Sequence, residues 1–359
     1  MTRRRRRRAL LLRALLGIGI SIVAGLLALR SIDPARVAEV LGRAAPSWLA
    51  VMLACSVVDL ALRGWRWQRL LVPVRRVRYP VTLGALLIGY LTNNLLPARL
   101  GELVRSHVLG DREGLSRTTV FGTVIVERVI DTATVVAIGA GSVALLSVRG
   151  VLGESVGLGV ALVGLLGGGL VVALAAHRLP GVRTIFQSLA RWPRARELIG
   201  RLRAGLAVAG RPRTIAEAAL LTVAAWTASV LAFAAAGAAV GADLVLSQAG
   251  FVAATVALAT AVPSGPAYLG TFELAAMTAG VTVGVPAERA LALGILVHAG
   301  IVAVTSAGGA GAVAVVWRTG SDVAWPTGSG AVAPGVGPDG ADPDGPDAPA
   351  SAGRRLPGP

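Results

Sequence analysis

Polar and helix-breaking residues interrupt an apolar stretch in the first third of this chain. They are Asn93, Asn94, Pro97, Arg99, Gly101, Glu102 and Arg105. Charged and amide groups are costly at membrane depth, where they persist mainly if they line a cavity, pair with one another or bind something. Proline and glycine also destabilise helix interiors. The stretch therefore predicts a broken helix that carries a polar site.

Two interpretations fit the charges of this stretch. Arg99, Glu102 and Arg105 are spaced i, i+3, i+6, so a helix places them along one face. Guanidinium groups bind phosphate bidentately, which suggests a phosphate clamp in which Glu102 orients the arginines or accepts a cationic headgroup. The alternative is a salt-bridge lock that ties the segment to a neighbouring helix. Asn93 and Asn94 would line the same cavity or cap the interrupted helix.

A second charged cluster lies further along, in the first half of a long apolar helix. Glu127 and Asp131 are four residues apart, with Arg128 between them. Both carboxylates could pair across the core with Arg99 and Arg105. A proton relay is the alternative, because intramembrane carboxylates often mark such paths. We favour pairing, and we count all three residues as candidates for substrate binding.

A third motif breaks a later apolar run. Pro263, Gly265, Pro266 and Gly270 are expected to interrupt a helix and expose half-helix ends to the cavity. Glu273 is the single buried charge there, and we expect it to bind substrate or to pair with an arginine of the first motif.

Other chemistry-bearing residues have simpler interpretations. Asp59 pairs with Arg63 at i+4, and His298 is a hydrogen-bonded packing residue. Cys55 is the only cysteine, which excludes a disulfide within the chain and a cysteine metal site. No metal-ligand cluster, phosphate-binding loop or nucleophile motif occurs in the sequence, so we expect no metal and no cofactor.

Composition excludes a soluble globular protein. Hydrophobic residues make up 54% of the chain, and the mean hydropathy is +0.70. The net charge of +16 comes from arginines that gather between apolar runs, a pattern typical of membrane orientation and anionic headgroups. We therefore expect a membrane partner and no nucleic acid.

The apolar runs predict an all-α polytopic membrane protein with about six full spans and two re-entrant or broken-helix hairpins. The spans are expected at 10–29, 48–62, 118–148, 155–176, 215–240 and 287–317. The hairpins are expected at 79–117 and 249–286, where the apolar runs are too short to cross. Six consecutive arginines at 3–8 place the N-terminus in the cytoplasm. The arginine-rich loops at 63–78 and 177–213 are also taken as cytoplasmic, which puts the C-terminus on the same side.

This topology predicts two inverted repeats, 48–148 and 215–317, within a transmembrane domain at 10–318. Both hairpins carry a similar segment, Pro97-Ala98-Arg99-Leu100-Gly101 and Pro266-Ala267-Tyr268-Leu269-Gly270. Inverted repeats with broken helices are a transporter design. Outside the domain we expect a basic cytoplasmic N-terminus at 1–9 and a disordered tail at 319–359. The loop 177–213 is either an amphipathic helix on the headgroups or a solvated basic loop.

The motifs resemble those of the lysylphosphatidylglycerol synthase transmembrane region family, also described as flippase-like integral membrane proteins. The run Asn93–Arg105 resembles the family's signature, and 127–131 and 263–273 resemble its later motifs. The chain departs from the family pattern at Ala267-Tyr268, where Gly-Gly is usual, and this puts a close backbone approach there in doubt. The resemblance implies a bacterial inner-membrane protein that handles polar-headgroup or polyprenyl-linked lipids. Some relatives carry a soluble aminoacyl-transferring domain, which we do not expect after Arg318.

Three functions follow from these expectations. The first is a flippase that moves an anionic or glycosylated phospho- or polyprenyl lipid across the bilayer. The second is an intramembrane transferase that uses Glu102 or Asp131 as a base. The third is a membrane partner of a separately encoded synthase or glycosyltransferase. We prefer the flippase, since no conventional water-exposed active site is apparent.

Overall fold

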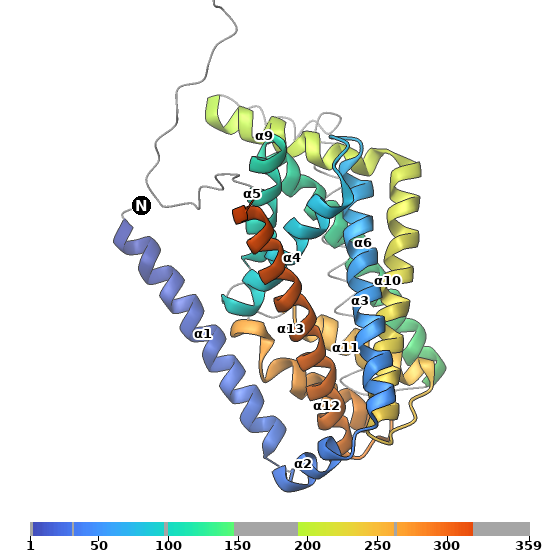
Figure 1. The fold of residues 1–359 in the computed structure, drawn as a ribbon. Helices are drawn as coiled ribbons and strands as arrows, with labels where there is room; N and C mark the ends of the chain where they lie inside the picture. The colour runs from blue at the N-terminus through green and yellow to red at the C-terminus, as the bar shows by residue number, and fades with distance from the viewer. Residues whose placement is uncertain (1–2, 31, 97–99, 147–192, 262–263, 319–359) are drawn as a thin grey trace, which may run out of the picture. The chain divides into compact units, whose positions relative to one another are not determined.

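The computed structural model describes residues 3–30, 32–96, 100–146, 193–261 and 264–318, and every regular element in them is a helix (Figure 1). The α-helices are α1 (Arg3–Leu29), α2 (Pro34–Gly42), α3 (Pro46–Leu71), α4 (Tyr79–Leu95), α5 (Gly101–Glu113), α6 (Arg117–Leu146), α9 (Pro193–Leu206), α10 (Pro212–Ala239), α11 (Leu246–Ala259), α12 (Thr271–Thr282) and α13 (Ala287–Arg318). Two short 3₁₀ turns, η1 (Ala207–Gly210) and η2 (Pro266–Tyr268), complete the described elements. The predicted all-α class is confirmed for these residues.

Four of these helices are long and apolar enough to cross a membrane. They are α3, α6, α10 and α13, and the count becomes five if α1 and α2, which meet at 85°, form one bent span. The span predicted at 155–176 lies outside the described residues, as does the tail predicted at 319–359. The structure therefore supports a polytopic membrane protein of four or five spans in its described part.

Helix α3 is longer than the sequence suggested. We expected a span at 48–62 followed by an arginine-rich boundary loop, but the helix continues to Leu71. Arg66 and Trp67 are consequently both fully buried in the bundle instead of lying at the membrane surface. Their burial follows from partners on α6 that are distant in sequence.

Both predicted hairpins consist of two short helices. The first contains α4 and α5, which pack against each other, and the second contains α11 and α12, which also pack together. With 17 and 14 residues, α4 and α11 are about 25 and 21 Å long, less than the hydrocarbon core of roughly 30 Å. Short apolar helices that stop inside the bundle bring their polar ends to its interior.

The breaks fall where glycine and proline occur. Gly101 begins α5, and Gly265, Pro266 and Gly270 surround η2 just before α12. Gly270 has a positive φ of 82°, a conformation that glycine adopts without strain. Pro97 and Pro263 lie outside the described residues.

Helix α13 holds the two hairpins together, because it packs against both α4 and α12 (Figure 1). Gly308 and Gly309 let it approach α4 closely: a Cβ atom on Gly309 would lie 2.8 Å from the carbonyl oxygen of Leu87. Small residues allow such close contacts between membrane helices. Large apolar side chains such as Leu26, Leu220 and Val223 are instead exposed on the outside of the bundle, as expected for a lipid-facing surface.

Candidate functional site

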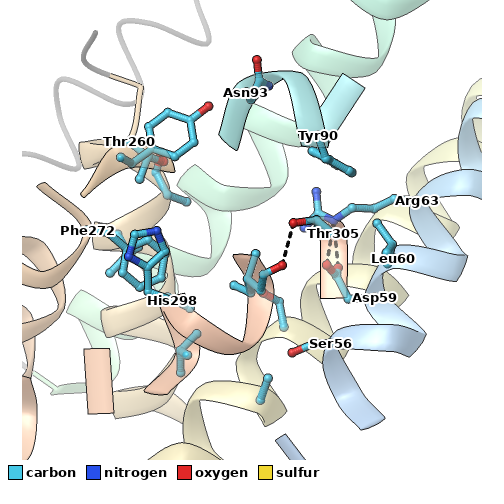
Figure 2. A pocket seen from close by; sticks show the side chains of 18 of the residues that line it. Ser56, Asp59, Leu60, Arg63, Tyr90, Asn93, Thr260, Phe272, His298 and Thr305 are labelled. Carbon is cyan, nitrogen blue, oxygen red and sulfur yellow. Dashed lines mark hydrogen bonds and ion pairs between the residues drawn. The ribbon is translucent and has the colours of Figure 1, made fainter. Parts of the chain in front are cut away.

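A cavity of about 310 Å³ lies between the two hairpins and the long helices around them. Among the described residues, five charged side chains line it: Asp59 and Arg63 of α3, Glu102 of α5, and Arg128 and Asp131 of α6. Figure 2 shows Asp59 and Arg63 on one wall, with Phe272 and His298 on the opposite wall. A charged cavity among apolar helices is the arrangement expected of a binding site in a membrane protein.

Aromatic side chains form much of the rest of the cavity wall. Tyr90, Trp226, Tyr268 and Phe272 all line the cavity. The guanidinium of Arg63 lies 4.9 Å from the centre of the Trp226 ring, within the range of a cation–π contact. The cavity therefore offers flat apolar surfaces beside its charged groups.

A buried ion network supports this wall from behind. Arg66 Nη2 donates to Glu127 Oε1 at 2.8 Å, and Arg105 Nη1 donates to Glu127 Oε2 at 3.0 Å. These three side chains are at most 2% exposed and none of them lines the cavity. Arg105 also stacks over Trp67, 4.6 Å from the ring centre. The contacts join α3, α5 and α6.

Asp131 connects the buried network to the cavity. Its Oδ1 accepts from Arg66 Nη1 at 2.7 Å, from Arg63 Nη1 at 3.3 Å and from Trp226 Nε1 at 3.1 Å. Its Oδ2 lies 3.6 Å from Arg128 Nη1. Because both carboxylate oxygens of Asp131 have partners, this residue can orient the guanidinium groups around it.

The charges of the cavity and its support balance. Among the described residues there are four guanidinium groups and four carboxylates, namely Arg63, Arg66, Arg105, Arg128, Asp59, Glu102, Glu127 and Asp131. Arg128 Nη2 lies 3.2 Å from Glu102 Oε1, and two buried atoms of this pair, Arg128 Nε and Glu102 Oε2, have no hydrogen-bond partner among the described residues. Buried polar atoms normally have partners, so this pair is the natural place for a ligand.

The two asparagines combine the roles left open by the sequence. Both line the cavity. Asn93 Oδ1 accepts from the backbone N–H of Gly101 at 2.8 Å and so caps the first turn of α5. Asn94 Nδ2 donates to Thr305 Oγ1 and Ser306 Oγ of α13 at 2.9 and 3.0 Å. The two asparagines thus attach the end of α4, just before the first break, to α5 and to α13.

Glu273 is held by α13 and by the break before α12. Its Oε1 lies 2.5 Å from His298 Nδ1 of α13, and its Oε2 accepts from the backbone N–H of Gly270 at 2.7 Å. Among the described residues, its ion-pair partner is His298, whereas Arg99 of the first hairpin lies outside them. The carboxylate also caps the start of α12, which begins one residue after Gly270.

The second break has an unusual backbone. Ala267 and Tyr268 have φ angles of 52° and 61°, in the left-handed region that favours glycine. These are the two positions at which the sequence departs from Gly-Gly. The break therefore keeps a glycine-like conformation with larger residues, at a cost of about 1–3 kcal/mol each that the surrounding contacts must offset.

Comparison with known proteins identifies the family. A family model described as "Lysylphosphatidylglycerol synthase TM region" matches residues 14–309. The chain belongs to this family. The family match covers both hairpins, the ion network and the cavity, and it confirms the resemblance seen in the motifs.

Two curated proteins are similar to this family member. One is "Glycosyltransferase AglD" of Haloferax volcanii, which is 31% identical over 346 residues, covering 82% of this chain and 54% of that protein. The other is "UPF0104 membrane protein" of Methanothermobacter thermautotrophicus, 32% identical over 123 residues, covering 32% of this chain and 36% of that protein. The chain spans about half the length, or less, of the curated relatives that it matches.

The structure separates the predicted site residues of this family member into three groups. Asn93, Asn94, Glu102, Arg128 and Asp131 line the cavity. Arg105, Glu127 and Glu273 lie behind its wall and hold other side chains. Arg99 lies outside the described residues.

Sequence reasoning missed several cavity residues. Asp59 and Arg63 do form the predicted i, i+4 pair, with Arg63 Nε 2.9 Å from Asp59 Oδ2, but they also face the cavity. Trp226 and His298 line it as well. A charged pair at the end of a predicted span was the available signal for the first two. Within the described ranges, no three His, Cys, Asp or Glu side chains are grouped as a metal ion requires.

Proposed function

We propose that this protein is a lipid flippase that moves a lipid with a polar headgroup across the bilayer. The observation that carries the proposal is the cavity of about 310 Å³, charged on one wall and enclosed by apolar helices. A polar headgroup cannot cross hydrocarbon without large cost, whereas fixed charges and amides in a cavity replace its water. The lipid tail would stay among the apolar side chains.

We propose a glycosylated phospho- or polyprenyl lipid as the substrate, ahead of a simple anionic phospholipid. The cavity wall carries the guanidinium groups of Arg63 and Arg128 beside the carboxylates of Asp59, Glu102 and Asp131. This mixture of donors and acceptors suits a headgroup rich in hydroxyls. Trp226 and Tyr90 supply flat surfaces for sugar rings. The free Nε of Arg128 would bind the linking phosphate. The similarity to a protein named as a glycosyltransferase supports this choice.

We further propose that the hairpins belong to two inverted repeats, with both termini on the cytoplasmic side of a bacterial inner membrane. In support, α4 and α5 lie in the upper half of Figure 1, whereas α11 and α12 lie in the lower half. The test uses Arg76→Cys, just before α4, and Val245→Cys, just before α11, each in a Cys55→Ser background. An impermeant maleimide should label them from opposite sides of the membrane; labelling from one side would refute the repeat.

A second candidate is a membrane partner of a separately encoded glycosyltransferase. It is favoured by the similarity of this membrane region to part of a protein named for that activity. An intramembrane transferase that uses Asp131 as a base is less consistent with the geometry, because both of its carboxylate oxygens face guanidinium groups. Glu102, with a free Oε2, is the better candidate base.

Reconstitution separates these functions. Purified protein in liposomes should translocate a fluorescent polyprenyl-phosphate sugar faster than fluorescent phosphatidylglycerol, as measured by quenching of the outer leaflet. Translocation that appears only after a glycosyltransferase is added would favour the partner. New lipid product formed in detergent, where no second leaflet exists, would favour the enzyme.

A further inference from the structure

A short hydrogen-bonded chain crosses the second break beside the cavity. His298 Nδ1 lies 2.5 Å from Glu273 Oε1, and His298 Nε2 lies 2.6 Å from the carbonyl oxygen of Ala267. The imidazole is buried and stacks on Phe272 at 4.3 Å. Both ring nitrogens of His298 therefore face oxygen atoms that ordinarily accept.

The hydrogen bonds that link Glu273, His298 and Ala267 require a definite number of protons. The carbonyl of Ala267 can only accept, so Nε2 must carry a hydrogen. The short contact to Glu273 then needs another proton, either on Nδ1 or on the carboxyl group. A neutral imidazole facing an ionised carboxylate has one proton too few, and one of the two contacts would become repulsive. Both contacts are therefore favourable only when the pair holds one exchangeable proton.

That proton holds a strained element in place. The contact to Ala267 fixes the residue at φ 52°, next to Tyr268 at φ 61°. Glu273 fixes the other end through the N–H of Gly270. On the outer side, Ser21 Oγ of α1 accepts from the N–H of Gly265 at 2.9 Å. Ala267, Tyr268 and His298 all line the cavity, so a change here would reshape its wall.

Within the described part of the chain, the charged groups around His298 come from several elements. Across the cavity, the titratable groups are Asp59 and Arg63 of α3, Tyr90 of α4, Glu102 of α5, Arg128 and Asp131 of α6 and Tyr268 of η2. The residues of α10 and α11 that line the cavity carry no titratable group, and α1 meets the break through Gly17, Ser21 and Gly25. The ion-paired side chains of α2 are exposed. Glu273 is the carboxylate in direct contact with the imidazole.

We propose that Glu273 and His298 form a proton-binding site that latches the second break, so that loss of the proton releases the cavity wall around Tyr268. Proton binding is thereby linked to the shape of the cavity. The further step, that a proton gradient drives translocation, rests on the proposed flippase function. The latch itself does not.

Two substitutions at the pair give opposite expectations. In Glu273→Gln, the amide nitrogen donates to Nδ1, the amide oxygen accepts from Gly270, and neutral His298 still donates to Ala267. The latch then stays closed at every pH. In His298→Gln, one amide cannot serve both partners, and the latch stays open at every pH. In the protein with both Glu273 and His298, the latch should change from closed to open once as the pH rises.

The readout is the rate at which a maleimide labels Leu269→Cys, placed next to the break at an exposed position, in full-length Cys55→Ser protein in liposomes. Val245→Cys, also exposed, corrects for the ionisation of the thiol. Between pH 5 and 9 the corrected rate should rise about fivefold or more at one midpoint, the factor expected when one net hydrogen bond is lost. Glu273→Gln should give the slow rate throughout.

Histidine ¹⁵N NMR supplies an independent signal, because the chain has three histidines and the His298→Gln spectrum identifies the resonance of interest. A corrected labelling rate that does not change with pH would overturn the latch, as would a Glu273→Gln protein that titrates like its parent. Translocation unaffected by a pH gradient, with the latch still switching, would remove only the coupling. A switching latch in a protein that never translocates lipid would instead refute the proposed function.

Discussion

Neutralising Glu127 should destabilise the protein more than any comparable change of charge on its surface. Glu127 accepts from two guanidinium groups, Arg66 at 2.8 Å and Arg105 at 3.0 Å, and all three side chains are at most 2% exposed. Removing one partner of a buried ion pair costs about 3–5 kcal/mol. Because glutamine keeps one acceptor and Arg66 keeps Asp131, we expect about 3 kcal/mol for Glu127→Gln. Arg105 would have no other carboxylate partner among the described residues.

The matched control is Glu39→Gln, which makes the same change at an exposed pair. Glu39 lies 2.9 Å from Arg43, and both side chains are more than half exposed. Such pairs contribute less than about 1 kcal/mol. Unfolding in mixed micelles, followed by tryptophan fluorescence, gives both free energies. The double variant Arg105→Gln, Glu127→Gln should lose at least about 1 kcal/mol less than the sum of the single changes. Equal losses for Glu127→Gln and Glu39→Gln would refute the stabilising role of the network.

Two further predictions concern the close packing at Gly101 and the orientation of Asp131. Gly101→Ala should destabilise the protein by about 1–3 kcal/mol, because the added Cβ would overlap the carbonyl oxygen of Gly89. The control is Gly141→Ala, which places a Cβ in open space and should be neutral or stabilising. Thermal unfolding in detergent compares the two proteins. Trp226→Phe removes the 3.1 Å hydrogen bond to Asp131 and should slow translocation of the sugar lipid while costing about 1–2 kcal/mol of stability. An unchanged translocation rate would show that this bond does not position the cavity charges.

Local sequence signals predicted the elements that local chemistry determines. Proline and glycine marked both helix breaks, and the i, i+4 spacing of Asp59 and Arg63 predicted their ion pair. Asn93 caps α5 and also lines the cavity, and the sequence left both roles open. Each of these features depends on residues within about one or two helical turns of one another.

The remaining features depend on contacts that no local pattern encodes. Arg66 resembled the neighbouring boundary arginines, yet it is buried because its carboxylate partners lie more than 60 residues away on α6. Arg105 was expected to contact a ligand, because nothing nearby in sequence shows that its guanidinium is bonded to Glu127. His298 was correctly expected to be hydrogen-bonded, but its partner Glu273 could be identified only in three dimensions.

The most direct test of the cavity as the path for lipid is the translocation rate of the Arg128→Gln protein. Arg128 lines the cavity beside Glu102, and its Nε has no hydrogen-bond partner among the described residues. Arg43→Gln, at the exposed residue just after α2, is the matched control for the loss of one guanidinium. We predict that Arg128→Gln translocates the polyprenyl-phosphate sugar at least about tenfold more slowly than Arg43→Gln, the factor given by about 1.4 kcal/mol of lost interaction. Equal rates in two equally stable proteins would contradict the proposed path.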